Sequence, residues 1–262
     1  MDFFQRLLDI ESRIDSRDLD WYVANLDVEV MDYWAVWRPG RLVRSAETGS
    51  PVPAKCTIRE FLTGTGVLDL FLARDTIGLA AVQAAVVNPW GFVGFQFGEP
   101  LLIDLQYYRP ARTDGVPAFY APALPDETWR DGRTSSRYQD ESTGRWLLGT
   151  DVNRWAGTFT GRDGVHSFDD LRTYDCQLAI LRRSLRHTVT ILDQHFEKTG
   201  RDLWTSGLAP AGLLAAAHLA GPFGVVGYLE NGRSRSDEAG TPLTRYLAAF
   251  ADVVLTPEDL AG

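Results

Sequence analysis

An apolar stripe at helical spacing lies at the start of the chain and contains one carboxylate. The positions of this stripe are Phe4, Leu7, Leu8, Glu11 and Ile14. Recurrence at intervals of three and four residues predicts an amphipathic helix over residues 2–14, with Asp2 as its N-cap. Glu11 therefore lies on the face that this helix is expected to bury.

The position of Glu11 indicates a chemical role as well as a structural one. An ionised carboxylate on a buried face is unfavourable unless it is paired, so we expect its pKa to rise. A carboxylic acid that keeps its proton near neutral pH is the group with which a glycosidase protonates a leaving oxygen. The alternative is a Glu that only caps the helix or forms a salt bridge, and the stripe by itself leaves both interpretations open.

Further start and stop signals predict a chain dominated by helices. The expected helices cover residues 18–26, 58–63, 75–86, 99–107, 168–199, 210–220, 223–231 and 241–253. Thr57 and Glu60 form a capping-box pattern, and Ser167 is the expected N-cap of the longest helix. Gly200 is the expected end of that helix.

Three stretches lack helical spacing. Residues 33–58 contain several Pro and Gly turn signals, which predict extended segments around one hairpin. Residues 109–150 are rich in Pro, Gly, Asp, Arg and Ser, which predicts a long irregular excursion across the surface. Residues 151–165 form a further loop rich in Gly and Trp. Because strands are expected to be few and short, the predicted fold class is mainly α, with a small β and loop region.

The composition narrows the classes of protein that the chain can belong to. Its 262 residues, 45% of them hydrophobic, suffice for a core in one large domain or two small ones. The net charge of −9 argues against a nucleic-acid partner, because it would be repelled by a phosphate backbone. The sequence has no run of about 18 apolar residues, so no stable membrane insertion is expected.

The residue types of metal and thiol chemistry are scattered along the chain. Cys56 and Cys176 form no CxxC pair, and we expect two free thiols, with a single bridge as the alternative. The four histidines show no metal-ligand spacing, so no metal or other cofactor is expected. The N-terminus has an acid at position 2 and no basic n-region, so we expect synthesis in the cytoplasm without a signal peptide.

Four elements, taken in order, carry a family pattern. They are Ile10-Glu11-Ser12 with Asn88-Pro-Trp-Gly-Phe-Val-Gly-Phe-Gln-Phe-Gly-Glu99, then Trp155-Ala-Gly-Thr-Phe-Thr-Gly-Arg-Asp-Gly-Val165, then Gly212-Leu-Leu-Ala-Ala-Ala-His-Leu-Ala-Gly221, and last Asp237-Glu-Ala-Gly-Thr241 with Tyr246 and Phe250. Together they resemble the lysozyme-like or lytic transglycosylase superfamily, in its phage- and mobile-element-associated branch. Apart from the first helix, the resemblance covers residues 88–253.

The resemblance implies a fold and an activity. It implies one lysozyme-like domain over residues 1–262 that cleaves the β-1,4 bond of peptidoglycan, as a lytic transglycosylase or a muramidase, with Glu11 as the general acid. The saccharide-binding residues that it implies are Asn88, Trp90, Gly94, Gln96, Trp155, Phe159 and Tyr246. It implies no second carboxylate, because an acetamido or 6-hydroxyl group of the sugar does that work in this superfamily. The implied partners are glycan strands and, by analogy, the proteins of a phage-tail or secretion-type particle that would export the chain.

Two departures from the family pattern leave an alternative open. Glu11 precedes Gly91 by 80 residues, far more than in the family, so residues 15–85 would be an insertion, as residues 109–150 would be. If Glu11 is not the acid, the family position falls near Asp75 or Leu79. The protein would then be an inactive structural or carbohydrate-binding component of such a particle. The loop is also one residue shorter than usual, which affects the match of Gln96.

A third interpretation is a protein-interaction module, in which the two insertions bind a partner. Exposed tryptophans in these segments would favour it, and the candidates are Trp21, Trp34, Trp37, Trp129 and Trp146. Two other residues are expected to have structural roles. His218 lies among alanines and is expected in the core, and Glu99 is expected to interact with a helix dipole.

Overall fold

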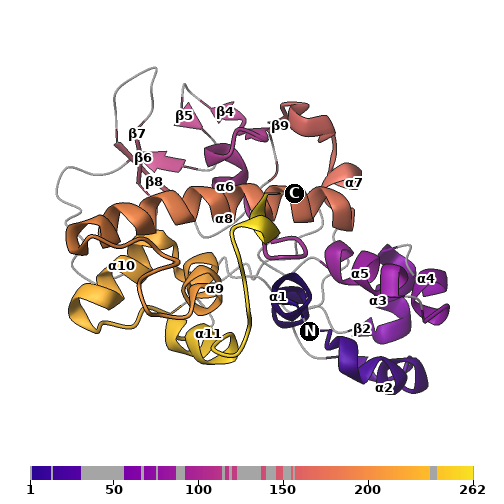
Figure 1. Ribbon diagram of the computed structural model, residues 1–262. Helices are drawn as coiled ribbons and strands as arrows, with labels where there is room; N and C mark the ends of the chain where they lie inside the picture. The colour runs from indigo at the N-terminus through magenta and orange to yellow at the C-terminus, as the bar shows by residue number, and fades with distance from the viewer. Residues whose placement is uncertain are drawn as a thin grey trace. The chain divides into compact units, whose positions relative to one another are not determined.

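The computed structural model describes most of the chain as helix, loop and short strand (Figure 1). The described residues are 2–12, 14–30, 56–65, 68–74, 76–86, 92–113, 116–117, 120–122, 137–139, 146–149, 155, 157–236 and 241–261. The mainly α fold class is confirmed. The chain divides into two compact units, one made of Met1–Ile10 with Leu178–Gly262 and the other of Glu11–Gln177.

The described residues of the first unit form helices joined by loops. Its elements are the start of α1 (Phe3–Ser12), most of α8 (Tyr174–Phe196), η3 (Glu197–Thr199), α9 (Pro210–Ala220), α10 (Pro222–Asn231), α11 (Leu243–Ala249) and η4 (Glu258–Leu260). Gly200, with φ of 69°, ends the helix as expected, and Pro210 and Pro222 lie at the helix starts that their fixed φ favours. Helix α9 packs against α10 and α11 (Figure 1).

The first residues of α1 belong to the core of this unit. Phe3 is 1% exposed, and its ring centroid lies 5.2 Å from that of Phe250. Arg6 donates to the carbonyl of Ala249 at 2.8 Å and forms an ion pair with Asp252. Asp2 accepts the backbone N–H of Gln5 at 2.8 Å, which confirms the predicted N-cap.

The second unit holds shorter helices and all of the named strands. Its helices are η1 (Ser16–Asp18), α2 (Leu19–Ala24), α3 (Ile58–Thr65), α4 (Leu68–Leu72), α5 (Thr76–Ala85), α6 (Glu99–Asp104), η2 (Arg162–Gly164) and α7 (Phe168–Leu171). The predicted capping box begins α3, since Thr57 Oγ1 accepts the N–H of Glu60 at 3.1 Å and Glu60 Oε2 accepts the N–H of Thr57 at 2.8 Å. Helix α4 was not expected from the sequence.

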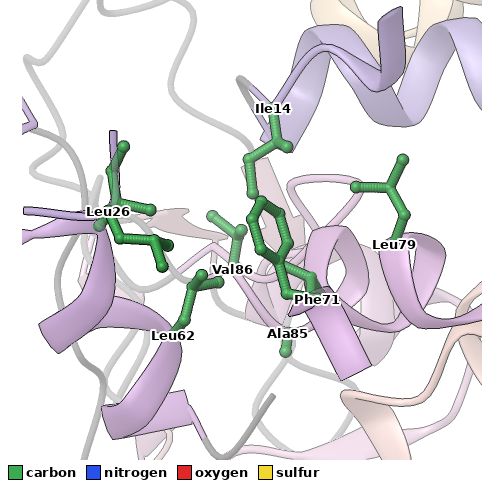
Figure 2. Packing of buried hydrophobic residues seen from close by; sticks show 9 residues of the cluster. Ile14, Leu26, Leu62, Phe71, Leu79, Ala85 and Val86 are labelled. Atoms are coloured by element: carbon green, nitrogen blue, oxygen red, sulfur yellow. The ribbon is translucent and has the colours of Figure 1, made fainter. Parts of the chain in front are cut away.

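Helices α3, α4 and α5 pack together and form a hydrophobic cluster with residues from the start of the unit (Figure 1). Its members are Ile14, Leu26, Ile58, Leu62, Phe71, Leu79, Val82, Ala85 and Val86. Figure 2 shows the Phe71 ring near the centre of this cluster. Ile14, the last position of the predicted apolar stripe, is 1% exposed. The segment that would be the first insertion thus has a core of its own.

Short antiparallel strands replace part of the predicted irregular excursion. The pairs are β1 (Glu29–Val30) with β2 (Cys56–Thr57), β3 (Tyr108–Arg109) with β9 (Thr158–Phe159), and β4 (Arg112–Thr113) with β5 (Val116–Pro117), and a three-stranded sheet has the order β6 (Tyr120–Pro122), β8 (Trp146–Gly149), β7 (Arg137–Gln139). In β3 and β9, Tyr108 lies opposite Phe159. The expectation of irregular structure over 109–150 was wrong at these strands, because two to four residues are too few for an alternating pattern to identify a strand.

Three predicted helices differ from the observed ones by a break or by more than two residues at one end. The long helix expected over 168–199 is interrupted after α7, where the Thr173 hydroxyl donates to the carbonyl of Asp170 at 2.8 Å and the Thr173 carbonyl accepts the N–H of Gln177. Ser167 nevertheless caps α7 by accepting the N–H of Asp170. Helices α6 and α11 end earlier than expected, at Asp104 and Ala249. Most of the predicted hairpin over 33–58 lies outside the described residues.

A helix that spans a membrane must meet requirements of length and of apolar composition. Within the described ranges no single helix meets them. Helices α9 and α10 meet them only when taken together, and they are bent by 116° relative to each other.

Candidate functional site

A tight turn in the second unit forms the centre of the candidate site. Val93 and Phe97 exchange two backbone hydrogen bonds of 3.0 Å, so the residues between them reverse the chain. Gly94 has φ of +55° and Gln96 has φ of +62°. The left-handed region is rare for a residue with a side chain, and such residues concentrate where a fold constrains a functional position. The turn also buries Phe95 completely.

The fully buried side chain of Gln177, at the start of α8, holds this turn. Its Oε1 accepts the N–H of Phe95 at 3.1 Å, and its Nε2 donates to the carbonyl of Ala84 at 2.7 Å. The Gln177 amide also lies directly against Gly94, where a Cβ atom would be 2.0 Å from Oε1. Position 94 therefore requires glycine for its backbone conformation and for this close approach.

Two glutamine amides hold the carboxyl end of α1, which carries Glu11. Gln96 Nε2 donates to the Glu11 carbonyl at 3.0 Å, and Gln83 Nε2 donates to the Ile14 carbonyl at 2.7 Å. The last carbonyls of a helix lack partners within the helix, so Gln96 supplies a bond that the helix cannot. Gln83 holds the chain two residues after α1 ends. Ser12, the last residue of α1, accepts the N–H of Ile14 at 3.2 Å.

A contact thus joins the end of α1 to the turn at residues 93–97. Glu11 and Gln96 are 85 residues apart and are linked by a direct hydrogen bond. Glu11 itself is partly buried, between fully buried stripe residues such as Leu8 and Ile14. Leu79, near which the family position would fall if Glu11 is not the acid, is 5% exposed and packs in the cluster around Phe71.

A buried carboxylate follows the turn by two residues. Glu99 is 1% exposed, and its Oε1 accepts the backbone N–H of Trp155 at 2.8 Å. The nearby Tyr108 hydroxyl accepts the N–H of Gly157 at 2.6 Å. Burial, and to a lesser extent the negative charge of Glu99, raises the pKa of Tyr108 well above its usual value, so this hydroxyl stays neutral.

Four aromatic rings gather around the segment that Glu99 holds. Trp155 contacts Phe168 at a centroid distance of 4.7 Å and Tyr108 at 5.3 Å, both edge to face. Phe159 lies parallel to Trp155, with 11° between the ring planes and 6.5 Å between the centroids. Trp155 and Phe159 both remain partly exposed, so each has a core contact and some surface accessible to a ligand.

The segment after β9 is held in a similar way. The Tyr107 hydroxyl donates to Asp163 at 2.6 Å, and Arg162 donates to Gln106 at 2.7 Å. Gln106, Trp155 and Asp163 all have positive φ values, of 63°, 50° and 49°. With Gln96, these residues give the segments that carry the Gly and aromatic motifs four non-glycine positions of strained backbone.

The remaining predicted site residues lie either outside the described residues or in the first unit. Asn88 and Trp90 lie outside the described residues. Tyr246 lies in the first unit, is 5% exposed and stacks on Phe250, which leaves its ring little surface for a sugar. His218 is partly buried on α9.

The described residues also bear on metal and thiol chemistry. Among them, no group of three or more His, Cys, Asp or Glu side chains is arranged to hold a metal ion. Cys176 is a free, partly buried thiol, and burial raises its pKa to about 11, so it is a poor nucleophile near neutral pH.

Sequence reasoning missed the buried polar residues that organise the site. Gln83 and Gln177 were not considered, and Glu99 was assigned only to a helix dipole. Gln83 offered a signal, because it is the one amide in the apolar run from Thr76 to Val86. Gln177 and Glu99 offered no comparable signal in the sequence, because their burial depends on tertiary packing.

Comparisons with models of protein families, with curated proteins and with solved structures found no match to this chain. The family resemblance described above therefore stays a prediction.

Proposed function

We propose that this protein cleaves the glycan strands of peptidoglycan, as a lytic transglycosylase or a muramidase. Glu11 is the general acid in this proposal and delivers its proton to the glycosidic oxygen as the C–O bond breaks. The observation that most directly supports the proposal is the 3.0 Å hydrogen bond between Gln96 and the Glu11 carbonyl. It joins the backbone of Glu11, which carries the only carboxylate of the predicted apolar stripe, to the turn at residues 93–97.

The surrounding contacts supply what such a reaction needs. Gln83 and Gln96 fix the end of α1, so Glu11 starts from a defined backbone position. The partly exposed rings of Trp155 and Phe159 provide faces for sugar stacking. The second catalytic group would be an acetamido or 6-hydroxyl group of the substrate, so no partner carboxylate is required.

The variant Glu11→Gln tests this assignment. It keeps the shape of the side chain and removes the transferable proton, so we expect it to abolish the release of soluble muropeptides from purified sacculi. The thermal midpoint should stay the same or rise slightly, because Gln cannot ionise and so removes an ionisable group from a partly buried position. Asp9→Asn is the matched control on the same helix and should keep full activity. Equal activity of Glu11→Gln and wild type would exclude Glu11 as the acid.

A second candidate function, an interaction module, has one observation in its favour. Trp21 on α2 is 51% exposed, and Val28 and Leu72, from the same segment, are 43% and 41% exposed. Large apolar side chains exposed to solvent are a feature that a binding surface would have. An inactive wild-type protein that nonetheless sediments with intact sacculi would favour instead the inactive carbohydrate-binding component named above.

A further inference from the structure

Glu99 is buried more completely than a carboxylate at a helix start needs to be. It is 1% exposed, although its place as the first residue of α6 would allow it to face water. A buried carboxylate requires hydrogen-bond donors, and one of those present is the backbone N–H of Trp155, at 2.8 Å. The contact thus links two segments that are 56 residues apart.

Trp155 is held in a backbone conformation that it would not adopt readily by itself. Its φ of +50° lies in the left-handed region, which is unfavourable for a residue with a Cβ atom. A hydrogen bond from its N–H to a carboxylate is stronger than one to a neutral acceptor and can stabilise this conformation. The N–H that Glu99 binds and the strained φ belong to the same residue, so the hydrogen bond directly stabilises the strained backbone of Trp155.

The chain immediately after Trp155 is fixed by close packing. Gly157 donates to the Tyr108 hydroxyl at 2.6 Å. A Cβ atom at Gly157 would be 2.0 Å from the carbonyl oxygen of Arg109, so this backbone lies directly against β3. Glu99 and Tyr108 therefore hold neighbouring points of one segment, which leads into Phe159 on β9.

One short stretch connects this segment to the proposed acid. Gln96 and Glu99 are three residues apart; the first binds the Glu11 carbonyl and the second binds the Trp155 N–H. The turn and the start of α6 thus set where the end of α1 and the aromatic segment lie relative to each other. All of these residues belong to the second unit.

We propose that Glu99 is a positioning residue, which holds Trp155 so that its ring forms a binding face for an N-acetylated glycan beside Glu11. This inference rests on the proposed function, because it takes Glu11 as the acid. It differs from that function in assigning to Glu99 no contact with the substrate. Its effect reaches the substrate only through Trp155.

The test compares Glu99→Ala and Glu99→Gln with Asp104→Asn, which changes an exposed carboxylate at the other end of α6. On uncross-linked, solubilised glycan strands we expect Glu99→Ala to raise KM at least tenfold and to change kcat less than threefold. Glu99→Gln should recover part of this loss, because its amide oxygen can still accept the Trp155 N–H. Asp104→Asn should behave as wild type.

A double-substitution cycle distinguishes positioning from general destabilisation. If Glu99 acts through the Trp155 ring, adding Glu99→Gln to Trp155→Ala should raise KM no further. Hydrogen exchange at residues 155–159 should become faster in Glu99→Gln, and exchange in α3 should not change. Additive effects on KM, an unchanged KM in Glu99→Ala, or unchanged exchange at 155–159 would overturn the proposal.

Binding of chitohexaose, followed by tryptophan fluorescence, separates this inference from the proposed function. If wild type cleaves nothing but binds chitohexaose, and both Glu99→Gln and Trp155→Ala weaken that binding, the proposed cleavage fails and the role of Glu99 is supported. If wild type cleaves glycan while Glu99→Gln leaves both KM and exchange unchanged, the proposed function is supported and the role of Glu99 is overturned. If wild type neither cleaves glycan nor binds chitohexaose, both proposals fail.

Discussion

Individual buried or partly buried polar side chains in the second unit bind backbone groups of segments distant in sequence. Gln83, Gln96, Glu99 and Gln177 each connect two such segments by a hydrogen bond to a main-chain N–H or carbonyl. A buried backbone group without a partner is unfavourable, so each contact stabilises the fold and also fixes a position. At the residue scale, the candidate site is a set of such links around one turn.

Gly94 gives the clearest prediction at this scale. The substitution Gly94→Ala places a Cβ at positive φ and against the amide of Gln177, which cannot move without losing its bonds to Phe95 and Ala84. We expect it to lower the free energy of unfolding by about 3 kcal/mol, as measured by urea denaturation.

Gly164→Ala is the matched control for this prediction. Gly164 also has a positive φ, of +82°, but nothing lies within 4 Å of the position that its Cβ would take. Gly164→Ala should therefore lower the free energy of unfolding by only about 1 kcal/mol, the cost of placing a residue with a Cβ atom at positive φ. Equal losses in the two variants would show that the contact with Gln177 does not matter.

At the scale of elements, local sequence signals determine where helices begin and end, whereas the short strands and the break after α7 depend on contacts that form in the fold. Capping and stop signals predicted helix starts and ends such as Asp2, Thr57, Ser167 and Gly200, because the groups that satisfy these ends are local in sequence. The strands between 109 and 150 and the break after α7 depend on pairing and local bonding that leave no periodic pattern.

The capping box of α3 supplies the prediction for this scale. Thr57→Ala removes the hydroxyl that accepts the Glu60 N–H, so we expect a loss of about 1 kcal/mol in the free energy of unfolding. Thr63→Ala, on an exposed position of the same helix, should change stability little, since it removes no cap. A loss at Thr63 as large as that at Thr57 would contradict the role of the box.

At the scale of the whole molecule, electrostatics predicts how stability depends on pH. Six carboxylates in the described part of the chain have a lowered pKa because arginine, serine, threonine or backbone groups donate hydrogen bonds to them. They are Asp15, Asp27, Glu60, Asp170, Asp202 and Asp252. A carboxylate whose pKa is lower in the folded than in the unfolded state stabilises the fold at pH values above its unfolded pKa. This contribution to stability is lost as the pH falls through the folded-state pKa.

The thermal midpoint should therefore stay nearly constant from pH 7 to about pH 5 and fall below about pH 4. Scanning calorimetry across this range checks the prediction. Addition of salt should weaken the part of the effect that comes from the exposed ion pairs, such as Arg59 with Asp27. A midpoint that rises between pH 5 and pH 3 would contradict the assignment of these carboxylates.

The fold class followed from the sequence, and the site followed only in part. The family resemblance implied that Glu11 and Gln96 belong to one site, and a hydrogen bond joins Gln96 to the Glu11 carbonyl. The sequence did not predict that Glu99 is buried or that Trp155 is held through its backbone. Both depend on how the turn and the aromatic segment pack, which no local spacing encodes.

The most direct test of the account is mass spectrometry of what the wild-type protein releases from purified sacculi of several bacterial species. Cleavage beside Glu11 predicts soluble disaccharide peptides, with 1,6-anhydro ends for a transglycosylase or reducing ends for a muramidase. The same digest with Glu11→Gln should contain neither. Failure of the wild type to release glycan fragments from any of these walls would contradict the central claim.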